Sequence, residues 1–138
     1  MSPDTIVVDT NILFSLLLRG GTALRKRFLT GSAPTFHCPR FVFVELFQHK
    51  ERIAQATELS AEDLLECLSE LLARVRFVEE GGISIGTWME ARRLCRDVDA
   101  KDTPFIALTL HLDGRLWTGD DELKVGLRGK GFDRFFEP

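Results

Sequence analysis

Hydrophobic and polar positions follow two alternating patterns along the chain, one typical of short buried strands and the other of helices. Runs of β-branched and aromatic residues predict strands at 6–8, 35–38, 75–78 and 115–118. Apolar residues at helical spacing predict helices at 11–18, 22–30, 40–55, 61–74, 85–98 and 103–112. Ser60 and Asp63 form a capping box at the start of the fourth helix. Because strands alternate with helices, we expect an α/β fold with a central parallel β-sheet flanked by helices on both faces.

The composition is that of an ordinary globular protein. The 138 residues are 44% hydrophobic and 28% charged, and no apolar stretch approaches the roughly 20 residues that a membrane span needs. The apolar start lacks a basic leader, so we expect no signal peptide and a cytoplasmic location. The cysteines Cys38, Cys67 and Cys95 are widely spaced, which predicts reduced, buried thiols. A net charge of -3 gives no support by itself to nucleic-acid binding, so the distribution of charge has to decide that question.

A polar segment, Asp9-Thr10-Asn11, separates the first predicted strand from the helix that follows it. Asp120 follows the last predicted strand in the same way. Ligands of open parallel sheets bind beyond the carboxyl ends of the strands, so we expect the two carboxylates to face one crevice. A purely structural interpretation is also open for both sites, because Asp9 or Thr10 is suited to cap the following helix and Asp120 or Asp121 is suited to cap a following turn.

Glu45 is the only charged residue in the stretch FVFVELF, on a helix that is apolar nearly all round. Burying an unpaired carboxylate costs several kcal/mol, even after the surroundings relax. We therefore expect Glu45 to be protonated, to bind a cation, or to pair with His49 one helical turn away or with nearby Arg52.

A further group of acids, Asp97, Asp99 and Asp102, precedes the last predicted helix in DVDAKDTPFIALTL. Asp102 is suited to be the N-cap of that helix, and the other two fit solvated loop positions beside Lys101. Taken together, the acids of the chain put at least three carboxylates at one edge of the sheet. Like charges gathered in this way repel unless a cation neutralises them, and oxygen ligands suit Mg²⁺ or Mn²⁺.

Four stretches, IVVDTNILFSLL, FVFVELF, DAKDTPFIALTL and LWTGDDEL, occur in this order. Together they resemble the PIN-domain ribonucleases, including the VapC-like toxins of toxin-antitoxin pairs, over most of the chain. The resemblance implies a single PIN-like nuclease domain over residues 1–138. It also implies a catalytic quartet that binds Mg²⁺ or Mn²⁺, supported through hydrogen bonds by Asn11 and Thr118; the quartet is Asp9, Glu45, Asp102 and Asp120.

The last motif departs from that of many small toxins, because it reads Thr-Gly-Asp-Asp. Asp120 is preferred over Asp121 because it lies nearer the end of the strand. Asp99 and Asp121 are additional candidates for the site.

The resemblance further implies hydrolysis of single-stranded or structured RNA by a metal-activated water, leaving a 3′ hydroxyl and a 5′ phosphate. An antitoxin protein and a second copy of the chain are the expected partners, and the apolar region 64–72 is a candidate surface for either. Basic residues around the crevice are the candidates for holding the RNA backbone: Arg19, Arg25, Arg40, Lys124, Arg128 and Lys130.

Other functions fit the residues less well. An Asp at the end of the first strand also marks haloacid-dehalogenase-like phosphatases and response-regulator receivers. The phosphatases need a second Asp two residues on, where this chain has Asn11, and the receivers need an acidic pair that is absent here. An alternative from a different class is a catalytically idle PIN-fold scaffold that binds RNA or protein. A metal-dependent cleavage assay with defined RNA separates this alternative from a nuclease.

Overall fold

The computed structural model describes residues 5–20 and 35–137. Its sheet has four strands in the order β3-β2-β1-β4, and every neighbouring pair is parallel. The helix predicted at 22–30 lies outside the described residues. The strands are β1 (Thr5–Val8), β2 (Thr35–Pro39), β3 (Val75–Val78) and β4 (Arg115–Trp117).

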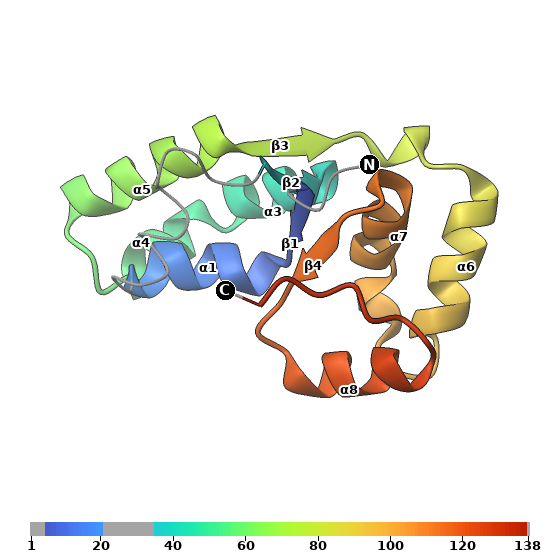
Figure 1. Ribbon diagram of the computed structural model, residues 1–138. Helices are drawn as coiled ribbons and strands as arrows, with labels where there is room; N and C mark the ends of the chain where they lie inside the picture. The colour runs from blue at the N-terminus through green and yellow to red at the C-terminus, as the bar shows by residue number, and fades with distance from the viewer. Residues whose placement is uncertain (1–4, 21–34, 138) are drawn as a thin grey trace.

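Helices lie on both sides of this sheet, so the predicted α/β class is confirmed. Figure 1 shows α6 and α7 to the right of the central strands and α1, α4 and α5 to the left. None of the helices that the structure describes is long and apolar enough to span a membrane. The described helices are α1 (Thr10–Arg19), α3 (Arg40–Gln48), α4 (Lys50–Ala56), α5 (Ala61–Arg74), α6 (Ile85–Cys95), α7 (Thr103–Leu112) and α8 (Asp121–Gly129), with short 3₁₀ turns at Glu80–Gly82 and Ala100–Asp102.

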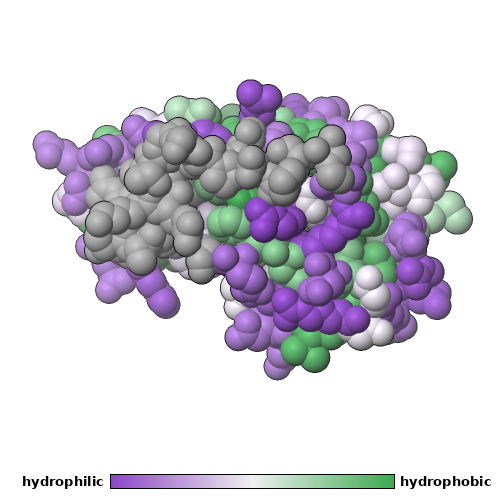
Figure 2. All heavy atoms as spheres, in the orientation of Figure 1, coloured by the Kyte–Doolittle hydropathy of each residue, from purple (hydrophilic) through white to green (hydrophobic). Residues whose placement is uncertain are grey.

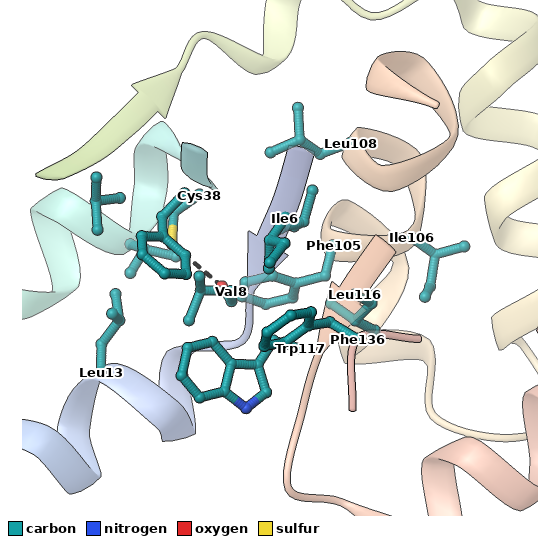
Figure 3. Close-up of a cluster of buried hydrophobic side chains, with 14 of the residues drawn as sticks. Ile6, Val8, Leu13, Cys38, Phe105, Ile106, Leu108, Leu116, Trp117 and Phe136 are labelled. Carbon is teal, nitrogen blue, oxygen red and sulfur yellow. Dashed lines mark hydrogen bonds between the residues drawn. The ribbon is translucent and has the colours of Figure 1, made fainter. Parts of the chain in front are cut away.

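The core is built from the central strands and from α7, which is buried nearly all round. Ile6, Val7 and Val8 of β1 are fully buried, and α7 contributes five consecutive buried residues from Phe105 to Thr109. Figure 3 shows side chains of α7, β1 and β4 gathered in one apolar cluster. Each such side chain contributes roughly 1.5–3 kcal/mol when it is fully buried. A rigid core therefore supports the carboxyl ends of β1 and β4.

All three cysteines are buried and free, as predicted. The Cys38 thiol donates a hydrogen bond of 3.1 Å to the carbonyl oxygen of Val8, which is drawn in Figure 3. Burial raises the pKa of the Cys95 thiol to about 11, so this thiol is protonated at neutral pH. These cysteines act as small core residues and not as nucleophiles.

The predicted helix over 40–55 is wrong as a single element, because it divides at His49 into α3 and α4. His49 has φ −103° and ψ 11°, yet its amide still donates to the Glu45 carbonyl and its own carbonyl accepts from Ile53. The hydrogen bonds on both sides of His49 are therefore kept while the backbone direction changes.

Two helix ends also differ from the expectation. The helix predicted over 85–98 ends at Cys95, whose carbonyl oxygen accepts from the amides of both Val98 and Asp99 in a turn. The segment after Asp120, expected to form only a turn, is the nine-residue helix α8. Ser60 caps α5 as predicted, because its hydroxyl accepts from the Asp63 amide at 3.1 Å.

On the face drawn in Figure 2, the described residues are mostly hydrophilic, with apolar residues scattered among them. Figure 2 shows isolated apolar patches on the side of the molecule where α6 and α8 lie. Ile85 and Met89 of α6 and Val125 of α8 are among the exposed large hydrophobic residues. Single exposed residues of this kind are normal on globular proteins and indicate no function by themselves.

Candidate active site

Neighbouring strands β1 and β4 place Asp9 beside Thr118. The register pairs Val8 with Trp117, so the next residue of each strand leaves the sheet at the same level. The Asp9 amide donates to the Trp117 carbonyl at 2.9 Å, and the Thr118 hydroxyl donates to Asp9 Oδ2 at 2.7 Å. Asp9 is 5% exposed and Thr118 is 2% exposed. The carboxylate is therefore held in one orientation in a nearly dry position.

Asp9 also occupies the N-cap position of α1, as the structural interpretation of the sequence allowed. Its Oδ1 accepts from the Asn11 amide at 3.5 Å, which is the long limit for a hydrogen bond. The shorter bond is the one from Thr118, so the orientation of the carboxylate depends more on β4 than on the helix. Burial raises the pKa of Asp9, and nearby Asp120 raises it further, while the bonds from Thr118 and Asn11 act in the opposite direction.

Asp120 is joined to Asp9 through the same threonine. The Asp120 amide donates to Thr118 Oγ1 at 3.1 Å, so one hydroxyl links the segments that carry both carboxylates. Asp120 caps α8 with a single oxygen, Oδ1, which accepts from the Leu123 amide at 3.1 Å. Asp121 lies in the first turn of α8 and is exposed. Of these two aspartates, Asp120 is the one whose charge raises the pKa of Asp9.

Asp102 occupies the N-cap position of α7, but its side chain makes no capping hydrogen bond, so the predicted capping role is wrong. Burial, followed by the charges of Asp9, Asp99 and Asp120, raises the pKa of Asp102 to about 7. Asp99 instead caps the short turn before α7 by accepting from the Lys101 amide at 3.1 Å. Four aspartates therefore act on one another electrostatically at this edge of the sheet.

Helix α8 approaches these aspartates closely because of a glycine. A side chain at Gly126 would bring its Cβ within 2.5 Å of Val98 Cγ1. Only a residue without a side chain allows α8 to lie against the segment just before Asp99. The contact places the start of α8, with Asp120, beside the turn that carries Asp99 and Asp102, and a pocket of about 280 Å³ is lined by residues of both segments.

Glu45 lies on α3, outside the strand ends and turns that carry the aspartates. It is only partly buried, so the expectation of a buried carboxylate inside an apolar helix is wrong. In the part of the chain that the structure describes, no ion pair joins Glu45 to His49 or Arg52. Glu45 instead lines an open hollow that it shares with Asn11 of α1 and with His49 and Arg52 of α4.

The donor set fits a hard divalent cation in its chemistry, although it is not assembled as a coordination sphere. Among residues 5–20 and 35–137, no three His, Cys, Asp or Glu side chains converge closely enough to hold a metal ion. The side chains that share the edge are nevertheless carboxylates with oxygen ligands, which Mg²⁺ and Mn²⁺ prefer. Mutual repulsion among Asp9, Asp102 and Asp120 is the property that a bound cation would relieve.

Most of the basic residues predicted to hold an RNA backbone are already paired with acids. Arg40 lies 3.6 Å from Glu79, and Arg25 is outside the described residues. The remaining paired cations and their partners are Lys124 with Glu137 at 3.1 Å, Arg128 with Asp133 at 2.7 Å and with Glu137 at 3.2 Å, and Lys130 with Asp97 at 2.8 Å.

Among the cations that form no salt bridge with a described residue, two lie at the hollow that Glu45 lines. They are Arg19, which was predicted, and Arg52, which was considered only as a partner for Glu45. Both line the hollow beside Asn11 and Glu45. The sequence does contain a signal for the role of Arg52 in this hollow. Glu45, His49 and Arg52 are four and then three residues apart, and residues at this spacing share one helical face.

Comparison with known families assigns the protein class. The PIN domain matches residues 7–135, which is nearly the whole chain, so the chain belongs to the PIN-domain family. PIN domains are generally nucleases that act on nucleic acid, and they typically use divalent metals. Comparison with curated proteins found no match.

Proposed function

We propose that this PIN domain is a Mg²⁺- or Mn²⁺-dependent endoribonuclease whose cation is held by Asp9, Asp102 and Asp120. The observation that carries the proposal is the arrangement of these carboxylates. Thr118 joins Asp9 to the Asp120 segment. Asp102 makes no capping hydrogen bond, and the negative charges of Asp9 and Asp120 help to raise its pKa. A helix cap or a solvated loop acid requires neither feature.

Each residue of the proposed site would have a defined part in phosphodiester hydrolysis. A bound divalent cation supplies charge neutralisation at the phosphate and a more acidic water. Thr118 keeps Asp9 in one orientation, and the α8 cap leaves the second oxygen of Asp120 available. Across the crevice, Glu45 and Asn11 line the hollow where substrate would enter and are placed to orient it or the attacking water.

No side-chain nucleophile is part of this proposal. The Ser84 hydroxyl is engaged at the N-cap of α6, where it accepts from the Thr87 amide at 3.2 Å. An in-line attack by water that expels the 3′ oxygen leaves a 3′ hydroxyl and a 5′ phosphate, whereas attack by the ribose 2′ hydroxyl expels the 5′ oxygen and leaves a 2′,3′-cyclic phosphate and a 5′ hydroxyl. The ends of the product therefore report directly on the proposed reaction.

The toxin assignment is a further part of the proposal. Leu65 of α5 is 63% exposed and, with Leu64 and Leu68, lines an apolar groove of about 180 Å³ against Phe47 of α3. An antitoxin helix or a second copy of the chain is the proposed occupant of this groove. Light scattering with and without a candidate partner tests it, and a Leu65→Glu variant should reduce association.

A catalytically idle scaffold is the second candidate, and one observation favours it: no three ligands are assembled in the described residues. A cleavage assay separates the two functions. Labelled RNA is incubated with the protein in EDTA, Mg²⁺ or Mn²⁺. Asp9→Asn should abolish metal-dependent cleavage, because it removes a ligand charge while keeping the shape of the side chain. The exposed Asp121→Asn is the matched control and should cleave as the wild type does.

The cleavage assay also defines the failure of the nuclease proposal. Unchanged cleavage by a pure Asp9→Asn preparation would exclude the proposed centre. Metal-independent cleavage, or a cyclic phosphate product, would exclude the proposed reaction even if RNA is cut.

A further inference from the structure

The hollow next to the candidate active site has the composition of a binding site for a nucleotide. It lies between α1 and α4, measures about 580 Å³, and falls within the roughly 300–1,000 Å³ range of small-molecule sites. Asn11, two residues after Asp9, brings the hollow up to the catalytic edge. Its other lining residues are Phe14, Ser15, Leu18, Arg19, His49, Arg52, Ile53 and Ala56.

The hollow combines two kinds of surface. Phe14, Leu18 and Ile53 give it apolar lining, and Arg19 and Arg52 are exposed guanidinium groups on two different helices. Neither arginine forms a salt bridge with another described residue. Aromatic rings that stack with bases, combined with cations that contact phosphates, are characteristic of proteins that bind single-stranded nucleic acid.

The two walls of the hollow are fixed to each other by hydrogen bonds. The Thr57 hydroxyl, just after α4, donates to the carbonyl oxygens of Leu17 and Leu18 at 2.7 and 3.3 Å. The Glu58 amide also donates to the Leu18 carbonyl at 2.8 Å. These bonds satisfy carbonyl groups in the last turn of α1 and hold that turn against the end of α4. Arg19 and Arg52 are therefore attached to walls whose separation is set in advance.

The helix break at His49 contributes to the same geometry. It separates α3 from α4, so Glu45 lies on one helix and Arg52 on the next, yet both line one hollow. The acid is on the side that includes Asn11, close to Asp9 in the sequence. An RNA strand that entered the hollow would place one phosphate near Arg19 and Arg52 and the next phosphodiester bond toward the aspartates.

We propose that this hollow binds an unpaired nucleotide next to the bond to be cut, with Phe14 contacting the base and Arg19 and Arg52 contacting the flanking phosphates. The inference rests on the proposed nuclease function and names the residues of this chain that hold the strand beside the bond to be cut. In an A-form duplex the bases are stacked and paired, so none can reach Phe14 without unpairing. The paired cations of α8 are not part of the phosphate track.

Binding without metal tests the site separately from catalysis. Fluorescence anisotropy in EDTA measures the affinity of the protein for a labelled single-stranded RNA and for a blunt duplex containing the same strand. The single strand should bind more tightly. The double variant Arg19→Gln/Arg52→Gln should bind it at least about tenfold more weakly at low salt. The slope of log affinity against log salt should become shallower by about 1.4, as expected for two lost single-strand phosphate contacts.

Matched variants identify the role of each part. Arg128→Gln with Lys124→Gln removes two cations that are already paired and should leave the affinity and the salt slope unchanged. Phe14→Leu keeps an apolar side chain but removes the ring, so it should weaken binding by about fivefold or more without changing the salt slope. Circular dichroism confirms that each variant is folded.

The results distinguish failure of this inference from failure of the proposed function. If the wild type cleaves RNA with Mn²⁺ but the arginine variants bind and cleave as it does, the hollow is not the subsite and the nuclease proposal stands. Equal affinity for single strand and duplex, or no RNA binding at all, also overturns the subsite. If binding depends on the two arginines but no metal supports cleavage, the subsite stands and the nuclease proposal fails.

Discussion

Thr118 imposes the tightest single-residue constraint on the candidate site. Its hydroxyl donates to Asp9 and accepts from the Asp120 amide, so one side chain orients two acidic segments. The resemblance to PIN-domain ribonucleases predicted a supporting role for Thr118. The geometry comes from the pairing of Val8 with Trp117, which no local pattern in the sequence specifies.

Replacing Thr118 with valine should destabilise the protein and reduce activity. Valine has a similar shape but no hydroxyl, so the buried Asp9 carboxylate and the Asp120 amide both lose a partner. The expected loss in the free energy of unfolding is about 1–3 kcal/mol, measured by urea denaturation near neutral pH. Thr118→Ser keeps the hydroxyl and should retain most of the stability. Equal losses in the two variants would show that the methyl group, and not the hydrogen bonds, is what matters.

Other single residues show where sequence reasoning reached its limit. The candidate acids could be predicted because each stands out from its neighbours in a local pattern. Whether Glu45 is buried, or whether Lys124 is free to contact a phosphate, depends on residues far away in the sequence. Lys124 pairs with Glu137, thirteen residues later, and Arg128 pairs with both Asp133 and Glu137. Surface pairs of this kind leave no periodic signal.

Secondary structure was largely predictable at the level of elements, because apolar spacing reports directly on burial. The strand Val75–Val78 and the helix Thr103–Leu112 have the predicted bounds. The break at His49 was missed because the apolar spacing continues through it. Helix α8 was missed because it is short and contains Gly126 within it, which lowers helix propensity.

Two helix starts give contrasting predictions for the same kind of substitution. Ser60 accepts a hydrogen bond from Asp63 and caps α5, so Ser60→Ala should lower the free energy of unfolding by about 0.5–2 kcal/mol. Asp102 makes no such bond at α7, so Asp102→Ala in EDTA should cost less than Ser60→Ala, or should stabilise the protein by removing repulsion. Urea denaturation compares the two variants. A larger loss for Asp102→Ala would indicate that Asp102 supports α7 after all.

At the scale of the whole molecule, parallel pairing brings distant acids to one edge. Asp9 and Asp120 follow neighbouring strands, and Figure 1 shows that β1 and β4 end between α1 and α8. Convergence at the carboxyl ends was predictable from the alternation of strands and helices. The strand order β3-β2-β1-β4 was not, because side-chain periodicity does not specify which strands are neighbours. That Glu45 is only partly buried likewise follows only from the assembled fold.

The gathered carboxylates should make the metal-free protein less stable as the pH rises toward neutral. Burial and nearby acids raise the pKa of Asp102 from 3.8 to about 7 in the folded state. The folded protein therefore holds a proton that the unfolded chain releases. This contribution to stability is complete below the unfolded pKa and is lost as the pH climbs through about 7. Asp9, whose pKa is also raised, adds to the effect in the same direction.

Thermal melts of the wild type and of Asp102→Asn in EDTA, from about pH 5 to about pH 8, isolate this contribution. The melting temperature of the wild type should fall more over this pH range than that of the variant, because the variant carries no titrating group at position 102. The exposed Asp121→Asn controls for the loss of one negative charge and should follow the wild type. Identical pH profiles for wild type and Asp102→Asn would show that Asp102 does not titrate in this range.

Addition of Mn²⁺ should reverse the destabilisation near neutral pH, because the cation binds the assembled carboxylates and not the unfolded chain. A ligand at a hundredfold excess over its dissociation constant stabilises the folded state by about 2.7 kcal/mol. Asp102→Asn removes one repelling charge and one oxygen ligand of the proposed centre, so it should melt higher than wild type in EDTA and respond less to Mn²⁺. A variant that melts lower than wild type without metal, and shifts as much as wild type with it, would show that Asp102 stabilises the fold and does not bind the cation.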